Sequence, residues 1–111
     1  MSGIRACTLA DLADGVALRV VLDGRPVALV RLRDQVYAID DTCSHAEVSL
    51  AEGEVDVDEC ALECWKHGSL FDLRTGEALT LPAVRPVDVH EATVVVDEVF
   101  VTLADNGEAD R

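Results

Sequence analysis

The chain has 111 residues, enough for one hydrophobic core but too few for two, so we expect a single domain. Its 22 acidic residues against 9 Lys and Arg give a formal net charge of -13, which argues against nucleic-acid and membrane-surface partners. The charge either keeps the protein soluble or steers a basic protein partner into place. No apolar run has the length of a signal peptide or a membrane span, so we expect a soluble cytoplasmic protein, which we take to be a monomer.

The first half of the chain has the pattern of a β-meander. Residues 16–32 form two Val- and Leu-rich runs around Asp23 and Gly24, a pair typical of a two-residue hairpin turn. Residues 35–40 alternate with a period of two, which predicts a third strand. Ahead of the meander, only residues 10–15 could hold a helical turn.

A long loop and then further short strands follow the meander. Residues 42–53 have little alternation and are predicted to form a loop. Residues 54–64 alternate again, with a turn expected at Asp58 and Glu59. Another short strand is expected over residues 69–73.

The last part of the chain ends in a hairpin over residues 92–103. Before it, Pro82 and Pro86 exclude a helix and most central strand positions. About nine short strands separated by turns predict an all-β sandwich or small barrel. We expect one domain over residues 1–104 and a disordered polar tail over residues 105–111.

Two compact pairs of Cys and His stand out in the sequence. Cys43 and His45 lie in the first long loop as Cys-x-His, and Cys64 and His67 follow after eighteen intervening residues as Cys-x-x-His. The chain contains only 4 Cys and 3 His, and four of these seven residues form the two pairs. Cysteines in a reducing compartment serve as ligands or buried thiols more often than as disulfides. The pattern therefore predicts that these four residues bind metal at one site.

The two pairs resemble the cluster-binding motifs of Rieske-type iron–sulfur proteins. The resemblance rests on TCSH at residues 42–45 and CWKHG at residues 64–68, and it covers most of the chain from about residue 16 to residue 103. In that family, two Cys hold one iron of a [2Fe-2S] cluster and two His hold the other. The resemblance therefore implies a [2Fe-2S] cofactor with Cys2His2 ligation: Cys43 and Cys64 on the inner iron, and His45 and His67 on the outer iron.

The resemblance also implies the architecture around the cluster. We expect a Rieske-like small antiparallel β-sandwich or barrel with a cluster-binding subdomain of two loops. The loops would span residues 42–53 and 63–72, and a further loop at residues 80–86, which contains Pro82, would cover the cluster.

Two other kinds of metal site deserve comparison. Zinc also binds two Cys and two His, yet here both half-sites lie on loops of a β-rich chain whose own core would not need zinc to fold. A mononuclear iron oxygenase site needs two His and a carboxylate. Beyond His45 and His67 the chain offers only His90, which we interpret as a surface histidine, so this chain does not supply such a triad.

High-potential members of the family in respiratory complexes carry a disulfide between the two cluster loops. The corresponding positions here hold Val48 and either Trp65 or Lys66, so the bridge is absent and the chain resembles the soluble ferredoxins. Without it, Gly68, Pro82 and packing would have to hold the loops.

Hydrogen bonds to the cluster sulfurs also tune the potential in this family. Ser69 occupies the position of a serine donor, but Phe71 stands where high-potential members have a tyrosine. We therefore expect a potential in the lower part of the Rieske range. Trp65 lies where a partner would approach, so it could shield the cluster or contact that partner.

The resemblance implies an electron carrier rather than an enzyme. It would pass one electron from a flavin-dependent reductase to a terminal non-haem iron oxygenase, or to another acceptor with a basic surface. Two alternatives stay open: a ferredoxin that serves iron–sulfur assembly, and a redox-sensing or structural metal-binding module.

Other residues near the motifs have plainer interpretations. Cys60 alternates with Cys64, so its side chain is expected on the same face as a ligand, as a buried small hydrophobe or a redox-active thiol. Cys7, near a flexible start, has the same two interpretations. Asp40 and Asp41 belong either to a solvated loop or to an acidic rim around the exposed histidines.

Overall fold

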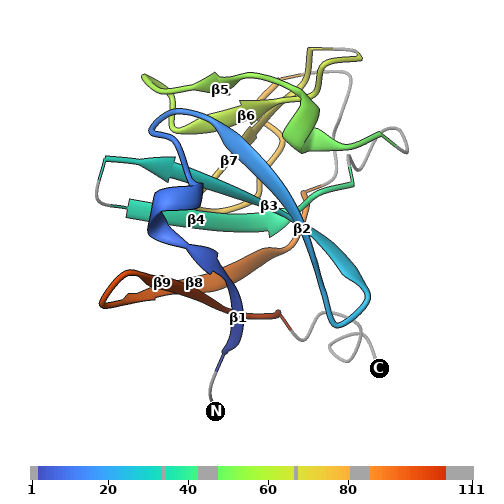
Figure 1. The fold of residues 1–111 in the computed structure, drawn as a ribbon. Coiled ribbons are helices and arrows are strands. Elements are labelled where there is room, and N and C mark those ends of the chain that lie inside the picture. The colour runs from blue at the N-terminus through green and yellow to red at the C-terminus, as the bar shows by residue number, and fades with distance from the viewer. Residues whose placement is uncertain (1–2, 34, 43–47, 67, 81–85, 105–111) are drawn as a thin grey trace.

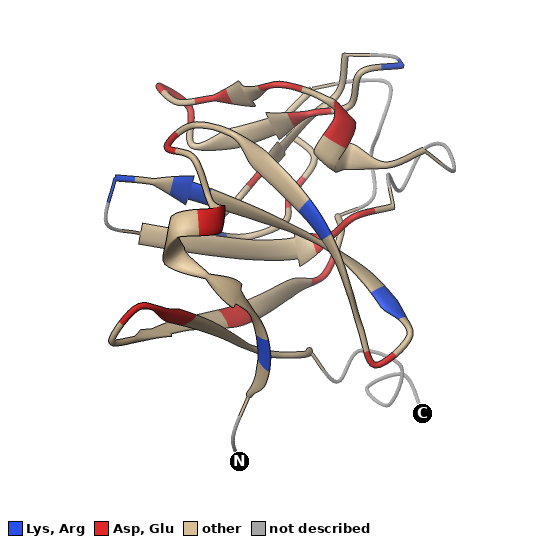
Figure 2. Ribbon diagram, viewed as in Figure 1, with Lys and Arg blue, Asp and Glu red and all other residues tan. Residues whose placement is uncertain are grey.

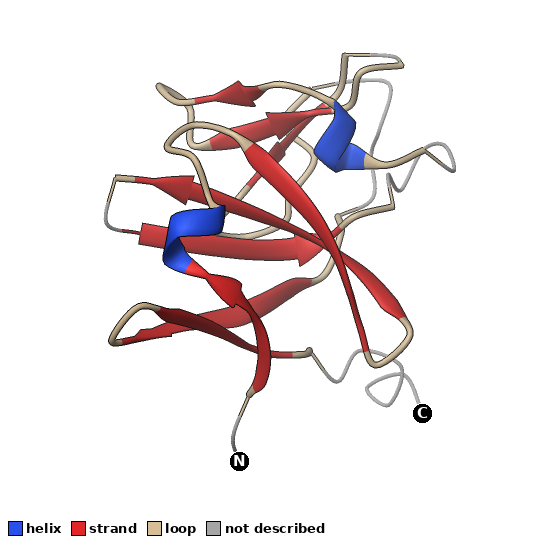
Figure 3. Cartoon of the chain, in the orientation of Figure 1, coloured by secondary structure: helices blue, strands red, loops and turns tan. Residues whose placement is uncertain are grey.

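The fold of the described residues is all-β, as predicted. The computed structural model describes residues 3–33, 35–42, 48–66, 68–80 and 86–104. Within these ranges it contains nine strands and two single-turn 3-10 helices (Figure 3). The elements are β1 Ile4–Thr8, η1 Leu9–Asp11, β2 Ala17–Leu22, β3 Arg25–Leu32, β4 Gln35–Asp40, η2 Leu50–Glu52, β5 Val55–Asp56, β6 Ala61–Glu63, β7 Leu70–Asp72, β8 Val89–Val95 and β9 Glu98–Thr102.

The predicted meander is present as β2, β3 and β4. Asp23 and Gly24 have φ angles of +53° and +83°, the left-handed pair of a two-residue type I′ turn, and Leu22 pairs with Arg25 directly beyond them. Glycine tolerates this conformation without cost, and Asp is among the few other residues that adopt it readily. Local turn chemistry therefore sets the register of the hairpin.

Six strands form one strongly curved sheet in the order β1-β9-β8-β4-β3-β2. All of its pairings are antiparallel. The two edge strands, β1 and β2, contact each other, so the sheet closes almost completely into a barrel (Figure 1). Near closure leaves little exposed strand edge for pairing with other chains.

Strand β1 was not predicted from the sequence. It pairs with β9, where Ile4 lies opposite Val101, and it places Cys7 inside the barrel with only 7% of its surface exposed. The prediction of a flexible start at Cys7 was therefore wrong, while its interpretation as a buried small side chain is confirmed. Only a partner strand more than ninety positions away orders this segment, which has no local turn signal of its own.

A second, smaller sheet of β5, β6 and β7 lies above the barrel (Figure 1). Its buried face and the barrel share one apolar core, which includes Leu62, Phe71 and Leu73, each with no exposed surface. A fully buried side chain of this size contributes about 1.5–3 kcal/mol relative to an exposed one. Burial of this face therefore holds the small sheet on the barrel.

Strand β3 is buried on both faces. Ala28 and Val30 point into the core shared with the small sheet, whereas Val27 and Leu29 point into the barrel interior. Successive side chains of a strand alternate between faces, so one short apolar run serves two cores. Strand β3 is thus the wall common to both halves of the molecule.

The described chain ends at Ala104, whose carbonyl accepts a 2.7 Å hydrogen bond from Arg25 Nη1. The predicted tail, residues 105–111, lies outside the described residues. No helix within the described ranges is long and apolar enough to cross a membrane.

Gly53 lies where two backbone segments of the small sheet approach most closely. It follows η2, and a Cβ atom built on it would overlap the carbonyl oxygen of Glu63 at the end of β6. The neighbouring Glu54 carbonyl accepts a 2.9 Å hydrogen bond from the Glu63 N–H. Close packing of loop against strand therefore requires glycine at this position.

Replacing Gly53 with Ala should lower thermal stability clearly, because backbone rather than a flexible side chain must move. We expect a loss of more than about 2 kcal/mol, the size of a severe steric change. Gly24→Ala is the control: its φ is left-handed, unlike that of Gly53, but no atom lies within 4 Å of the added Cβ, so its cost should stay near about 1 kcal/mol. Circular dichroism melts of both variants test this, and equal losses would contradict the packing argument.

Candidate metal centre

Cys64 lies at the end of β6, in a tight turn that backbone hydrogen bonds close. Its N–H donates to the Ser69 carbonyl at 2.7 Å, and its own carbonyl accepts from the Gly68 N–H at 2.8 Å. Gly68 has a φ of +79°, a conformation that suits glycine and closes the turn without strain. Cys64 and Ser69 have no exposed surface. The turn therefore holds a thiol and a hydroxyl in the molecular interior.

Trp65 within this turn and Phe71 just after it differ in exposure. Trp65, 52% exposed, points toward solvent, whereas Phe71 is fully buried in the shared core. Cys64 belongs to the same core, so the thiol and the Phe71 ring are parts of one packed unit. The Phe71 ring thus packs between the small sheet and the barrel, and it brings no hydroxyl to that position.

Four of the predicted site residues lie outside the described residues. These are Cys43, His45, His67 and Pro82.

The two feet of the loop at residues 43–47 are tied together. Thr42 and Ser49 form an isolated antiparallel bridge. The Leu50 N–H donates to the Asp41 carbonyl at 2.6 Å, and the Ala51 N–H donates to the Asp41 carboxylate at 2.9 Å. These contacts fix both ends of the loop that contains Cys43 and His45.

Asp41 is a buried structural residue, so its placement in a solvated loop or an acidic rim was wrong. Only 2% of its surface is exposed, and its carboxylate also accepts a 3.1 Å hydrogen bond from Arg19 Nε on β2. A buried carboxylate needs such partners, because an unpaired one would lose its hydration without compensation. The sequence carried no signal for this role, since Arg19 is 22 positions away.

Thr80 is a further residue that sequence reasoning missed. Its hydroxyl accepts a 2.9 Å hydrogen bond from the Leu70 N–H and donates to the Gly68 carbonyl at 3.4 Å. Thr80 directly precedes the segment that contains Pro82. One side chain therefore connects the turn after Cys64 to the start of the predicted covering loop.

His90 is buried, so its interpretation as a surface histidine was wrong. It retains 4% exposure on β8, and its Nδ1 accepts a 2.8 Å hydrogen bond from the Ala104 N–H. Since Nδ1 accepts, Nε2 carries the proton and donates to the Asp40 carboxylate, 2.8 Å away. Arg25 donates to the same carboxylate oxygen at 3.0 Å. The partners lie up to 50 positions from His90, which explains why the sequence pattern did not reveal them.

Cys60 does not alternate with Cys64 in one strand, in contrast to the prediction. It lies in the turn before β6 with a φ of +54°, and it is half-buried rather than buried. The left-handed backbone breaks the alternation, because β6 begins only at Ala61. The side chain of Cys60 therefore does not follow the alternation of β6.

The described residues fit an iron–sulfur group at this place. Cys64 offers a buried thiol, the ligand that iron–sulfur clusters require, and the buried Ser69 hydroxyl belongs to the same turn. Within the described ranges, no group of three or more His, Cys, Asp or Glu side chains could hold a metal ion, since three of the four predicted ligands lie outside them.

The barrel, the small sheet and the Cys and His pairs together define a small all-β metalloprotein of the iron–sulfur class. A family model described as Rieske [2Fe-2S] domain matches residues 3–96. The chain belongs to this family, and its cofactor is a Rieske-type cluster with the Cys2His2 ligation characteristic of the family.

Curated and structural relatives agree with this assignment. The 3-phenylpropionate/cinnamic acid dioxygenase ferredoxin subunit of Escherichia coli strain K12 is 40% identical over 104 residues, covering 93% of this chain and 95% of that protein. The ferredoxin of carbazole 1,9a-dioxygenase from Nocardioides aromaticivorans IC177 is 38% identical, with a TM-score of 0.90 over 94% of this chain and all of that one. These relatives are electron-carrying components, and the present chain is likewise an electron carrier rather than a catalytic oxygenase.

The pKa of Asp40 gives a pH-dependent prediction. Partial burial raises this pKa, but the hydrogen bond from His90 and the charge and hydrogen bond of Arg25 lower it by more, so the net pKa lies below its usual value. A lowered folded-state pKa stabilises the fold above the unfolded pKa of about 3.9, and this contribution is lost as pH falls through the folded value. The melting temperature of wild type minus that of Asp40→Asn should therefore be largest near neutral pH and shrink below about pH 4.

Melts followed by circular dichroism between neutral and acidic pH test this. Glu91→Gln, an exposed change on the same strand as His90, is the control and should show no comparable pH dependence. A difference between wild type and Asp40→Asn that stays constant across this pH range would contradict the proposed role of the network.

Proposed function

We propose that Cys43 and Cys64 bind the inner iron of the [2Fe-2S] cluster and that His45 and His67 bind the outer iron. The observation that carries the proposal is the complete burial of Cys64 in a turn closed by two backbone hydrogen bonds. An inner ligand should be buried, whereas the partner-facing ligands should lie at the surface. Support for the first pair comes from the Asp41 contacts, which fix the feet of its loop against the same core.

The bound cluster would supply one electron. Its mixed ligand set would place the reduction potential in a moderate range. Four thiolates make an oxidised plant-type cluster doubly anionic, whereas two neutral imidazoles leave a Rieske centre formally neutral, so adding an electron costs less. Potentials rise accordingly from about -400 mV to roughly -150 to +300 mV. Ser69 is buried in the same turn as Cys64, at the position of the family's serine donor, whereas Phe71 provides no hydroxyl, which favours the lower part of that range.

We further propose that the carrier takes electrons from a flavin-dependent reductase and delivers them to a terminal non-haem iron oxygenase, as a cytoplasmic monomer. Support for the oxygenase comes from a relative: a structure described as a complex of reduced oxygenase and oxidized ferredoxin in carbazole 1,9a-dioxygenase contains a chain 37% identical to this one, with a TM-score of 0.81 over 89% of this chain and all of that one. The ferredoxin relatives favour this role over iron–sulfur assembly or redox sensing.

The surface beside Cys64 suits a basic partner. Acidic residues gather over the small sheet and η2 (Figure 2). Glu52, Glu54 and Glu63 line a shallow hollow of about 400 Å³ together with Trp65. Within the described residues, no ion pair involves these three carboxylates. Uncompensated negative charge near the site favours encounter with a positively charged acceptor surface.

The ligand proposal predicts two redox results. The wild-type midpoint potential should lie in the lower part of the Rieske range, and a value above about +200 mV would refute this expectation. His67→Cys should lower the potential, because a thiolate adds negative charge to the cluster. His90→Gln, which removes the chain's one histidine outside the proposed ligand set, is the matched control and should leave the potential and the EPR g values nearly unchanged. No change with His67→Cys would exclude His67 as a ligand.

The carrier role is tested by electron delivery. Chemically reduced protein, mixed with substrate and the terminal oxygenase of the Nocardioides carbazole dioxygenase, should support product formation, with a rate that falls as salt concentration rises. Protein with the proposed ligand Cys64 changed to Ser should not support turnover. The proposed acceptor would be contradicted if the protein reduced a non-specific acceptor such as cytochrome c normally but supported turnover by none of the terminal oxygenases tested.

A further inference from the structure

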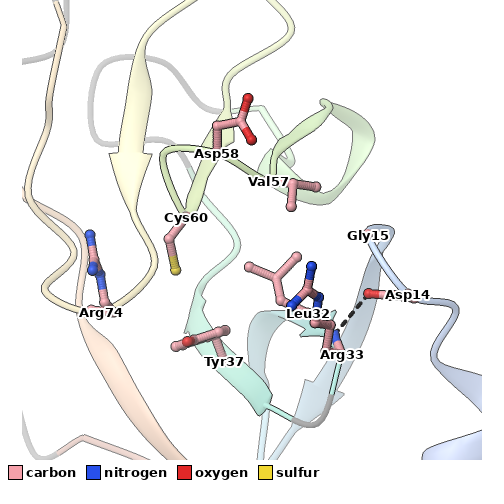
Figure 4. A pocket seen from close by; sticks show the side chains of 9 residues that line it. All are labelled: Asp14, Gly15, Leu32, Arg33, Tyr37, Val57, Asp58, Cys60 and Arg74. Carbon is pink, nitrogen blue, oxygen red and sulfur yellow. Dashed lines mark hydrogen bonds between the residues drawn. The ribbon is translucent and has the colours of Figure 1, made fainter.

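A second polar pocket lies beside the turn that precedes β6, and none of its described lining residues is a proposed cluster ligand. It has a volume of about 650 Å³. Figure 4 shows that Cys60, Tyr37 and Arg74 approach it from three different segments: the turn before β6, strand β4 and the residues after β7. Leu32 and Val57 provide apolar wall. The pocket therefore brings a thiol, a phenol and a guanidinium together.

The backbone at Cys60 is unusual and firmly held. Its φ of +54° lies in the left-handed region, which costs a residue with a side chain about 1 kcal/mol or more. The Cys60 N–H donates to the Val57 carbonyl at 3.3 Å, and its carbonyl accepts from the Leu73 N–H at 2.9 Å. This conformation directs the sulfur toward Tyr37 and the pocket (Figure 4). The strained turn thus presents a partly exposed thiol to a cavity.

Cys60 lies beside a phenol and a guanidinium. The Tyr37 hydroxyl forms a hydrogen bond with the Cys60 sulfur; partial burial first, and then this bond, raise the pKa of Tyr37, so the phenol keeps its proton and can donate it to sulfur. The positive charge of Arg74 interacts electrostatically with both Tyr37 and Cys60. A hydrogen-bond donor and a nearby cation both stabilise a thiolate, the reactive form of cysteine.

The charges around the pocket complement a small zwitterion rich in carboxylates. Arg33 is exposed, and within the described ranges no hydrogen bond or ion pair involves its guanidinium. Arg74 pairs with Asp72 at 3.3 Å, yet 61% of its side chain is exposed, so one face stays available. Asp58 adds one carboxylate to the lining, and the Asp14 carboxylate already accepts the Arg33 N–H. Two guanidiniums and Asp58 therefore match two carboxylates and one ammonium group.

We propose that this pocket is a thiolation site, at which Cys60 forms a mixed disulfide with a low-molecular-weight disulfide that carries carboxylates. The Cys60 thiolate attacks one sulfur of the reagent, a new S–S bond forms, and the reagent's own S–S bond breaks. The other half leaves as a thiolate and takes up the proton that Cys60 released. The reagent disulfide is thus the oxidant, and electrons balance without any further reactant.

The other cysteines do not compete for this reaction. Cys43 and Cys64 are the proposed cluster ligands. Cys7 is 7% exposed inside the barrel, and burial, followed by the charge of Asp11, raises the pKa of its thiol. Cys60 is the one described cysteine that combines exposure, a cavity and adjacent cations.

Glutathione disulfide is a suitable probe for the holoprotein, with intact-mass spectrometry and peptide mapping as the readout. We expect one glutathionyl adduct, on Cys60, with the visible absorbance of the cluster unchanged. Cys60→Ser should abolish the adduct, and Cys7→Ser should retain it. No adduct on the native protein, under conditions that modify the unfolded chain fully, would overturn the proposal, as would an adduct that forms only together with loss of cluster absorbance.

A second comparison separates a recognition pocket from simple thiol reactivity. Arg74→Gln should slow the reaction with glutathione disulfide at least about threefold, as expected for loss of an exposed ion pair. The same variant should not slow the reaction with cystamine, a cationic disulfide without carboxylates. Arg5→Gln, a distant exposed arginine on β1, is the matched control and should change neither rate. Equal effects of Arg74→Gln on both reagents, or no effect on either, would overturn the role of the pocket in recognition.

Discussion

The buried carboxylate of Asp41 is the contact on which the geometry of the metal centre most depends. It joins β2 through Arg19 and η2 through Ala51, while its backbone receives Leu50 and donates to Pro26 on β3 at 3.1 Å. Hydrogen bonds to a charged group are worth about 1.5–3 kcal/mol each, and removal of the carboxylate would leave the Ala51 N–H without this acceptor. Two residues after Asp41 comes Cys43, a proposed cluster ligand, so the barrel anchors the chain just before it.

The barrel can act as a support because β3 is packed on both of its faces. Side chains that alternate along β3 stabilise the barrel interior on one side and the small sheet on the other. The small sheet, which carries Cys64, therefore cannot shift without disturbing a core that the barrel shares. Loops on such a rigid base hold their side chains in place. A protein that only transfers an electron needs this rigidity at its cofactor site.

Features encoded by neighbouring residues could be predicted from the sequence, and features that depend on distant partners could not. Asp23 and Gly24 specify their hairpin locally, and the Cys and His motifs indicated the family that the family model confirms. By contrast, β1 forms only against β9, and the burial of His90 depends on Asp40 and Ala104. The prediction of a solvated Asp41 was wrong for the same reason. Its burial depends on the contact with Arg19, which is distant in the sequence. The prediction that Cys60 shares a face with Cys64 was wrong because the left-handed backbone at Cys60 interrupts the alternation that the sequence pattern suggests.

The absence of an interloop disulfide gains a physical explanation from these contacts. Each loop segment is anchored to the scaffold separately: the first through Asp41 and the Thr42–Ser49 bridge, the second through the Cys64–Ser69 hydrogen bond and the Thr80 hydroxyl. A covalent bridge would hold the loops to each other, whereas these contacts hold both to one core. Phe71 fits the same scheme, because its ring fills that core where a tyrosine hydroxyl would need a polar partner. Packing at Phe71 thus strengthens the scaffold, and the same residue carries no hydroxyl, the feature on which the proposed lower potential rests.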